Sequence, residues 1–247
     1  MKTNHEIKKI VNNVVQFTVT NLKNKGLISL YVSGSILTED RNQKSDIDLF
    51  GIVEQNFDFN NEEELNKLFI EKQEELCKGI ETRFHGVTIT ALQGGDIGRS
   101  VVGKKNFGVK TLIKRIPFYT QVWGKKFDFK KDFSITPFKL KDDALRQIEI
   151  TKDAITDFLK DKKTKKFEKL LKNIINLVAI EAEKEKGFSY DPSYSKLTRH
   201  LKKEDTHIIH KAMKLRNNDA TQDEMIQFCS DAEEYIKEIL KRVKKWD

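Results

Sequence analysis

The sequence has few residues that could build disulfides and no segment long and apolar enough for a membrane span. Only two of its 247 residues are cysteine, Cys77 and Cys229. They match no metal or redox spacing, so we expect two reduced, partly buried thiols. No apolar run approaches 18 residues, and the N-terminal segment MKTNHEIKKIV has no apolar signal core. These absences predict a soluble, cytoplasmic protein with no membrane partner.

A strong excess of one charge is lacking as well. The chain has 46 basic and 38 acidic residues and a net charge of +8, which indicates a mixed-charge surface rather than a polybasic one. A mild basic bias suits proteins that handle polyanions such as nucleotides or RNA. The Lys-rich stretch at residues 160–172 leaves nucleic acid open as a partner, although a solvated connection between two helices is the simpler interpretation.

The first half of the chain mixes helix and strand patterns. Apolar residues at helical spacing follow Asn4, a possible N-cap, and stop before Gly26. Short runs rich in β-branched residues predict strands between these helices. The predicted helices are at residues 5–22, 61–77 and 106–116, and the predicted strands are at 27–33, 46–53, 85–92 and 119–129.

The second half has a different character. From about residue 139 the segments carry apolar residues with a period of 3.6, and Pro137 stands at the transition. Neither an internal repeat nor a low-complexity tract is present. The chain therefore predicts an α/β domain over residues 1–130, followed by an all-α helical domain over residues 139–247.

One stretch, YVSGSILTEDRNQKSDIDLFGIV at residues 31–53, carries a pattern suited to phosphate and metal. Gly34 follows an apolar strand and, having no Cβ, lets another group approach the backbone. Ser35 and nearby N–H groups at the start of a helix can cradle phosphate oxygens. Asp46 and Asp48 share one face of the next strand, where they can hold Mg²⁺. Metal on a triphosphate would stabilise the charge of a departing pyrophosphate.

The same residues, SGS…SDIDLFGIV, resemble the signature of the nucleotidyltransferase superfamily, typified by DNA polymerase beta, poly(A) polymerase and the aminoglycoside adenylyltransferases. The resemblance covers about residues 27–128. It implies a small mixed sheet with helices on one side, and transfer of a nucleoside monophosphate, AMP from ATP, to a hydroxyl of a small molecule or larger acceptor. The implied nucleotide contacts are Gly34, Ser35 and Ser45, and the implied metal-binding and catalytic residues are Asp46 and Asp48.

The sequence departs from this family at one point. The family usually places a third carboxylate, the base that deprotonates the acceptor hydroxyl, on the strand that corresponds to residues 85–92. No Asp or Glu lies between Glu81 and Asp96, and Thr88 stands at the expected position. Glu81 or His85 could serve if the strand begins earlier than predicted, and Asp96 if it ends later.

Two other functions remain open at the level of sequence. A chain without the third carboxylate could bind a nucleotide or RNA without turning it over. Alternatively, the acceptor could be a side chain of a partner protein, which would make the chain a regulatory adenylyltransferase. The helical half, which would choose the acceptor, has no motif that separates these functions.

Overall fold

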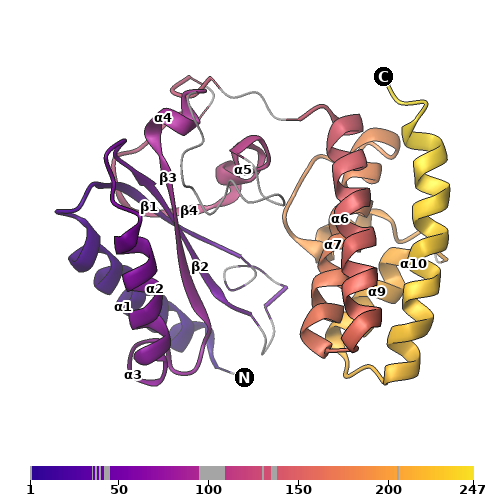
Figure 1. Ribbon diagram of the computed structural model, residues 1–247, viewed down its shortest axis with the longest axis horizontal. Coiled ribbons are helices and arrows are strands. Elements are labelled where there is room, and N and C mark those ends of the chain that lie inside the picture. The colour runs from indigo at the N-terminus through magenta and orange to yellow at the C-terminus, as the bar shows by residue number, and fades with distance from the viewer. Residues whose placement is uncertain are drawn as a thin grey trace. The chain divides into compact units, whose positions relative to one another are not determined.

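The computed structural model describes residues 2–34, 36, 38, 40–41, 45–94, 109–129, 131–134, 138–204 and 206–247. The chain folds as two compact units, Met1–Pro137 and Phe138–Asp247 (Figure 1). The first unit contains a sheet and helices, and the second is helical throughout its described elements. The predicted fold class, an α/β domain followed by an all-α domain, is confirmed.

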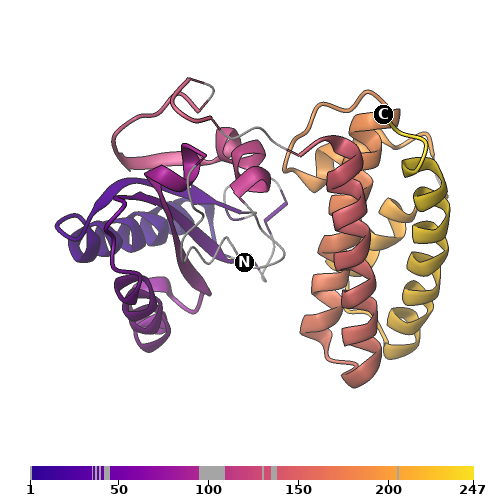
Figure 2. The same ribbon diagram turned by 45° about the horizontal axis from the view of Figure 1, so that its top comes forward.

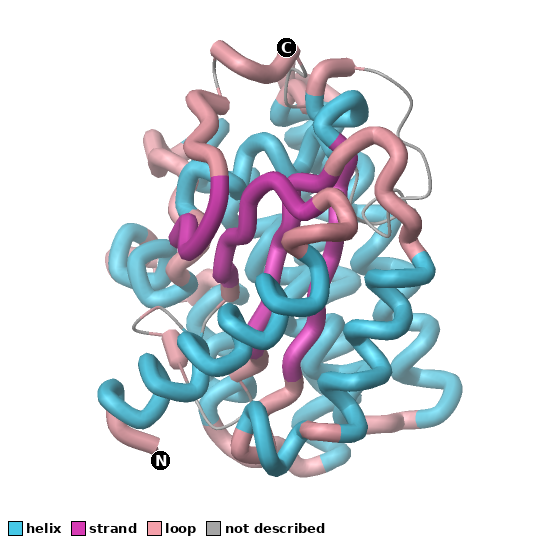
Figure 3. The backbone as a smooth tube through the Cα atoms, turned by 90° about the vertical axis from the view of Figure 1, so that its left-hand side faces the viewer, coloured by secondary structure: helices cyan, strands magenta, loops and turns pink. Residues whose placement is uncertain are grey.

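A four-stranded mixed sheet forms the centre of the first unit. Its strands, magenta in Figure 3, lie in the order β3-β2-β1-β4. β1 is antiparallel to both β2 and β4, whereas β2 and β3 are parallel. The strands are β1 (Leu27–Ser33), β2 (Ile47–Val53), β3 (Thr82–Thr88) and β4 (Thr120–Gly124).

Helices cover both faces of this sheet, one face more than the family resemblance implies (Figures 1 and 2). Ile47 and Leu49 of β2 pack with α1 and α2, whereas Phe50 and Ile52 pack with α4, α5 and η3. The alternation along β2 therefore assigns each position to one of two cores. The helices are α1 (Asn4–Leu22), α2 (Asn60–Glu71), α3 (Gln73–Cys77), α4 (Ile89–Leu92), α5 (Val109–Arg115) and the 3₁₀ helix η3 (Ile116–Phe118).

Several element ends differ from the predicted ones. The cap of α1 is Thr3 rather than Asn4, because the Thr3 hydroxyl accepts from Glu6 N while the Glu6 carboxylate accepts from Thr3 N. The helix predicted over residues 61–77 is divided at Lys72, whose backbone leaves the helical region. The third strand begins three residues earlier than predicted and ends at Thr88.

Side chains of α2 pair with the open edge of β3. Asn66 Oδ1 accepts from Phe84 N at 2.8 Å, and Asn66 Nδ2 donates to Phe84 O at 2.9 Å. One turn earlier, Glu62 Oε2 accepts from Gly86 N at 2.8 Å. These bonds satisfy backbone groups that an edge strand would otherwise leave open to another chain.

The second unit is a helical bundle around a single apolar core. Phe158, Phe167 and Phe228 are among its fully buried side chains. None of the helices in the described ranges is long and apolar enough to cross a membrane. The helices are α6 (Leu140–Asp161), α7 (Thr164–Glu185), α8 (Tyr194–His200), α9 (Ile208–Asn217) and α10 (Gln222–Val243).

Candidate active site

Two carboxylates stand at the start of β2. Asp46 immediately precedes the strand, and Asp48 is its second residue. Because side chains alternate along a strand, both carboxylates lie on the same face of the sheet as Phe50. Ile47 lies on the opposite face. Both residues are partly exposed. Asp48 is in register with Ser33, the last residue of β1, so the carboxylates lie beside the turn that follows β1.

Gly34 in that turn has no Cβ, and both carboxylates lie next to the space that a Cβ would fill. Its φ of +90° is in the left-handed region that favours glycine. A Cβ at this position would lie 3.3 Å from Asp48 Oδ2 and 3.9 Å from Asp46 Oδ1. Two carboxylate oxygens thus lie within 4 Å of one point that a side chain would fill.

This donor set fits Mg²⁺ shared with a triphosphate. Within the described part of the chain, no group of three or more His, Cys, Asp or Glu could hold a metal by itself. Mg²⁺ in nucleotide sites is commonly bound by one or two carboxylates together with substrate phosphates, rather than by an all-protein cage. Asp46 and Asp48 are therefore a suitable pair for a cation that arrives with a nucleotide.

A third carboxylate lies beside this pair. Ile47 is in register with Thr82, and Ile47 N donates to Glu81 O at 2.8 Å, so Glu81 is next to Asp46 across the two strands. On β3, Phe84 packs in the same apolar core as Ile47. Val87 packs in the other core, with Phe50. The alternation therefore puts Glu81 on the face of Asp46 and Asp48, and its side chain is 51% exposed.

Arg83 lies on the same face of the sheet as these three carboxylates. It is in register with Asp48 in the parallel pair of strands, and it shares the face of Glu81 two residues away. Its Nη2 donates to Glu81 Oε1. Among the described residues, three carboxylates and the guanidinium of Arg83 thus lie at this end of the face.

The assignment of Thr88 to the third-carboxylate position is wrong. Thr88 is the last residue of β3, in register with Val53 at the other end of β2 from Asp48. It is 5% exposed, and its hydroxyl accepts from Ala91 N at 3.2 Å as the N-cap of α4. The reason is the earlier start of β3, because it brings Glu81, rather than Thr88, next to Asp46.

The other residues singled out in the sequence have different surroundings. His85 is in register with Phe50, and its Nδ1 lies 3.8 Å from Glu62 Oε1 of α2. Ser45 is buried directly before Asp46. Ser35 and Asp96 lie outside the described residues.

The helical unit contains a buried charged cluster that the sequence did not indicate. Glu181 of α7 is 3% exposed and is bonded by His207 Nε2 at 3.3 Å, by Arg242 Nη2 at 2.7 Å and by the Tyr235 hydroxyl. Burial alone would raise the pKa of Glu181, but these hydrogen bonds outweigh it and lower the pKa to about 2. A single Glu in the apolar run INLVAIEA was the only sequence signal for it.

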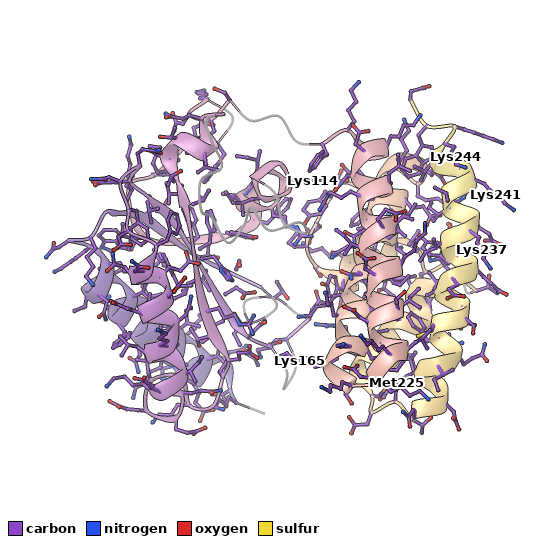
Figure 4. All side chains as sticks on the ribbon, viewed as in Figure 1. Lys114, Lys165, Met225, Lys237, Lys241 and Lys244 are labelled. Carbon is purple, nitrogen blue, oxygen red and sulfur yellow. The ribbon has the colours of Figure 1, made fainter. Side chains whose placement is uncertain are left out.

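The basic side chains of the helical unit lie mainly on its surface. In the Lys-rich stretch, Lys163 and Lys166 pair with Asp161 at the turn between α6 and α7. Lys237 and Lys241 of α10 and Lys244, the residue after its end, are exposed (Figure 4). The solvated interpretation of the Lys-rich stretch agrees with these contacts. The two cysteines are free and buried, and burial raises the pKa of Cys229 to about 11.

Comparisons with known proteins found a family model and a solved structure to which the chain is similar. Residues 12–118 match the family model described as a nucleotidyltransferase domain. Among solved structures, the chain is similar to spectinomycin adenyltransferase AAD(9) from Enterococcus faecialis, crystallised with ATP and spectinomycin, with a TM-score of 0.63 and 12% identity over 93% of this chain and 99% of that chain. No curated protein matches the sequence. Residues 12–118 of the first unit are therefore similar to a nucleotidyltransferase domain, and the solved structure shows that the chain shares the fold of that adenyltransferase.

Proposed function

We propose that the chain transfers AMP from ATP to a hydroxyl group in a Mg²⁺-dependent reaction. The observation that carries this proposal is the approach of Asp46 Oδ1 and Asp48 Oδ2 to one point beside Gly34, with Glu81 on the same face. Paired carboxylates at an open glycine turn suit a metal-bound triphosphate. A third carboxylate next to them suits proton abstraction from an acceptor.

Each residue has a separate task in this reaction. Asp46 and Asp48 would hold Mg²⁺, which supplies positive charge for the transferred phosphorus and the departing pyrophosphate. Gly34, Ser35 and Ser45 are the proposed nucleotide contacts, and the missing Cβ of Gly34 would admit the phosphates. Glu81 takes the proton of the acceptor hydroxyl, and its half-exposed carboxylate is open to an acceptor from solvent.

The same proposal assigns a role to each of the two units. Residues 1–130 form the nucleotidyltransferase domain, and residues 139–247 form a helical domain that contributes to the choice of acceptor. The similar structure was crystallised with ATP and spectinomycin, so ATP is the first nucleotide to test and spectinomycin the first acceptor. The alternative of an inactive nucleotide-binding protein was based on a missing base, and the position of Glu81 beside Asp46 supports an active enzyme instead.

Calorimetry with ATP and Mg²⁺ tests the metal pair. We expect Asp46→Asn and Asp48→Asn each to abolish Mg²⁺-dependent ATP binding and pyrophosphate release, because one neutral amide cannot replace a carboxylate beside the cation. Both variants should keep their fold, since both side chains are partly exposed. Asp153→Asn, at an exposed position of α6, is the matched control. Unchanged ATP affinity in both site variants would contradict the proposal.

A further inference from the structure

The Lys-rich stretch at residues 160–172 holds much of the chain's positive charge. Its seven lysines stand against two acidic residues, Asp161 and Glu168, so the stretch has a net charge of +5, compared with +8 for the whole chain. Asp161 is shared by Lys163 and Lys166, at 3.7 and 2.9 Å. The ion pairs at this turn therefore leave most of the positive charge of the stretch in solvent.

Three further lysines form a stripe along α7. They are four and three residues apart, so they lie on one face of the helix. All three are exposed, and none of them has an ion pair or a hydrogen bond with another residue that the structure describes. This α7 stripe consists of Lys165, Lys169 and Lys172.

Helix stability does not explain the α7 stripe. The start of a helix has partial positive charge, which favours acidic residues. The other long helices, α1, α6 and α10, each have an acidic residue in the first turn, whereas α7 has none there and has Lys165 and Lys166 instead. Lysines four or three residues apart also repel one another. The stripe therefore lowers the stability of the helix rather than raising it.

Lys162, just before α7, is unfavourable for another reason. It ends α6 with a φ of +54°, in the left-handed region where glycine is the common residue. A lysine at this position keeps a positive charge at the cost of backbone strain. Residues that break local preferences without a gain in stability commonly mark functional positions.

A second stripe of lysines has an ordinary explanation. The α10 stripe, Lys237, Lys241 and Lys244, has the same spacing and is also exposed (Figure 4). Lys241 and Lys244 lie at the end of the helix, where partial negative charge favours cations. Lys237 follows Glu233 by four residues, which is a stabilising spacing for opposite charges. The α10 stripe thus stabilises its helix, whereas the α7 stripe does not.

We propose that the α7 stripe, together with Lys162, binds the phosphate backbone of a nucleic-acid duplex. From Lys165 to Lys172 the helix rises about 10 Å, and about 10 Å of duplex holds three phosphates on each strand. Three lysines without partners in the protein match three successive phosphates of one strand. The inference goes beyond the proposed function, because the proposed metal and nucleotide residues take no part in it.

The side chains around the stripe favour a duplex over a single strand or a membrane. Proteins that hold a single strand stack its bases on aromatic rings, but Phe167, the one aromatic residue of the stretch, is 2% exposed. A helix that lies on a membrane presents apolar side chains beside its lysines. Leu170 and Leu171 are instead buried in the core, and Leu159 alone is exposed among the described large apolar side chains of this unit.

The experiment measures binding of the full chain to a short duplex of mixed sequence, as DNA and as RNA, by fluorescence anisotropy. Affinity is followed from about 50 to about 200 mM salt, because each neutralised phosphate contributes about 0.9 to the slope of log K against log salt. The triple variant Lys165→Gln, Lys169→Gln and Lys172→Gln should lower the magnitude of this slope by about 2.7 and weaken binding at least about tenfold at the lower salt concentration.

The α10 stripe supplies the matched control. Lys237→Gln, Lys241→Gln and Lys244→Gln together remove the same charge at the same spacing, so the net charge of the chain falls equally. This triple variant should bind the duplex within about twofold of wild type. Far-UV circular dichroism confirms the folding of both triple variants, which change only exposed side chains.

Lys162 and Lys78 form a second matched pair, since both end a helix with a positive φ. Neither Lys162→Gly nor Lys78→Gly should lower the urea midpoint of unfolding, because glycine adopts this φ without strain. Only Lys162→Gly should lower the magnitude of the salt slope, by about 0.9.

Three results would overturn the inference. Equal losses of affinity in the two triple variants would mean that only net charge attracts the duplex. No binding of wild type to either duplex at about 50 mM salt would leave the stripe without this partner. Stripe-dependent binding to vesicles of equal parts phosphatidylcholine and phosphatidylserine, with no duplex binding, would assign the stripe to a membrane surface. Asp46→Asn should leave duplex affinity unchanged, so failure of the proposed function is a separate result.

Discussion

Gly34 and Asp48 share a space that no other residue at position 34 would leave open. A Cβ on Gly34 would lie 3.3 Å from Asp48 Oδ2, which is closer than nine in ten real contacts of a Cβ. The backbone of Gly34 also has a φ of +90°, which side-chain-bearing residues rarely adopt. The glycine therefore serves both the turn after β1 and the room around the carboxylate.

Gly34→Val separates these two tasks when it is compared with Gly187→Val. Gly187 also has a positive φ, +68°, but a Cβ there would meet nothing within 4 Å. Both variants should lose stability from the backbone strain, by about 1 kcal/mol or more. Only Gly34→Val should weaken ATP·Mg²⁺ binding, by at least about tenfold, or about 1.4 kcal/mol. Calorimetry measures this difference, and equal ATP affinity in the two variants would place the nucleotide elsewhere.

The sequence was sufficient to predict the part of the site that depends on local spacing. Gly34 directly follows a buried strand, and Asp46 and Asp48 are two residues apart on the next one. A period of two puts both carboxylates on one face without any knowledge of the sheet. These residues could therefore be proposed from the chain alone.

The third carboxylate could not be chosen in the same way, because it depends on where β3 begins and how it pairs with β2. The β-branched run Val87-Thr88-Ile89-Thr90 resembles a strand, but the chain turns into α4 after Thr88. The alternation of buried Thr82 and Phe84 with exposed Arg83 was the better signal. The register between β2 and β3, whose paired residues are 35 positions apart, is set by packing, which no local pattern contains.

Glu81→Gln tests the position that the register assigns to the base. The substitution keeps the size of the side chain but removes its ability to take a proton. We expect turnover, measured as pyrophosphate release, to fall by about 10²–10⁴-fold. ATP·Mg²⁺ affinity should stay within about twofold, because Asp46 and Asp48 are unchanged. A variant with full activity would exclude Glu81 as the base and return attention to Asp96, outside the described residues.

Thr88→Val tests the structural role that replaced the predicted catalytic one. The hydroxyl of Thr88 caps α4 and is buried, so valine keeps the shape and removes the bond to Ala91 N. We expect the free energy of unfolding, measured in urea, to fall by about 1 kcal/mol with kcat unchanged. Thr90→Val, one position into α4, controls for a second threonine without the cap. A loss of turnover at constant stability would contradict this assignment.

The helical unit offers a test that is independent of catalysis, in the cluster around Glu181. The pKa of Glu181 in the folded chain is lowered from 4.5 to about 2, since hydrogen bonds from His207, Tyr235 and Arg242 outweigh the effect of burial. In the unfolded chain these donors are lost, and the carboxyl titrates near its ordinary value. The unfolded state therefore takes up a proton first as the pH falls.

The sign of the pH dependence follows from this order. The stabilisation by Glu181 is fully present above about pH 4.5, and it is lost as the pH falls toward the folded value of about 2. A shift of this size corresponds to a stabilisation on the order of 3 kcal/mol. Urea unfolding between pH 7 and pH 3 should therefore show a decline that is smaller in Glu181→Gln, although that variant is less stable at pH 7. Glu233→Gln, at an exposed position of α10, should keep the wild-type slope. Parallel slopes in all three proteins would mean that the acid sensitivity comes from carboxylates outside this cluster.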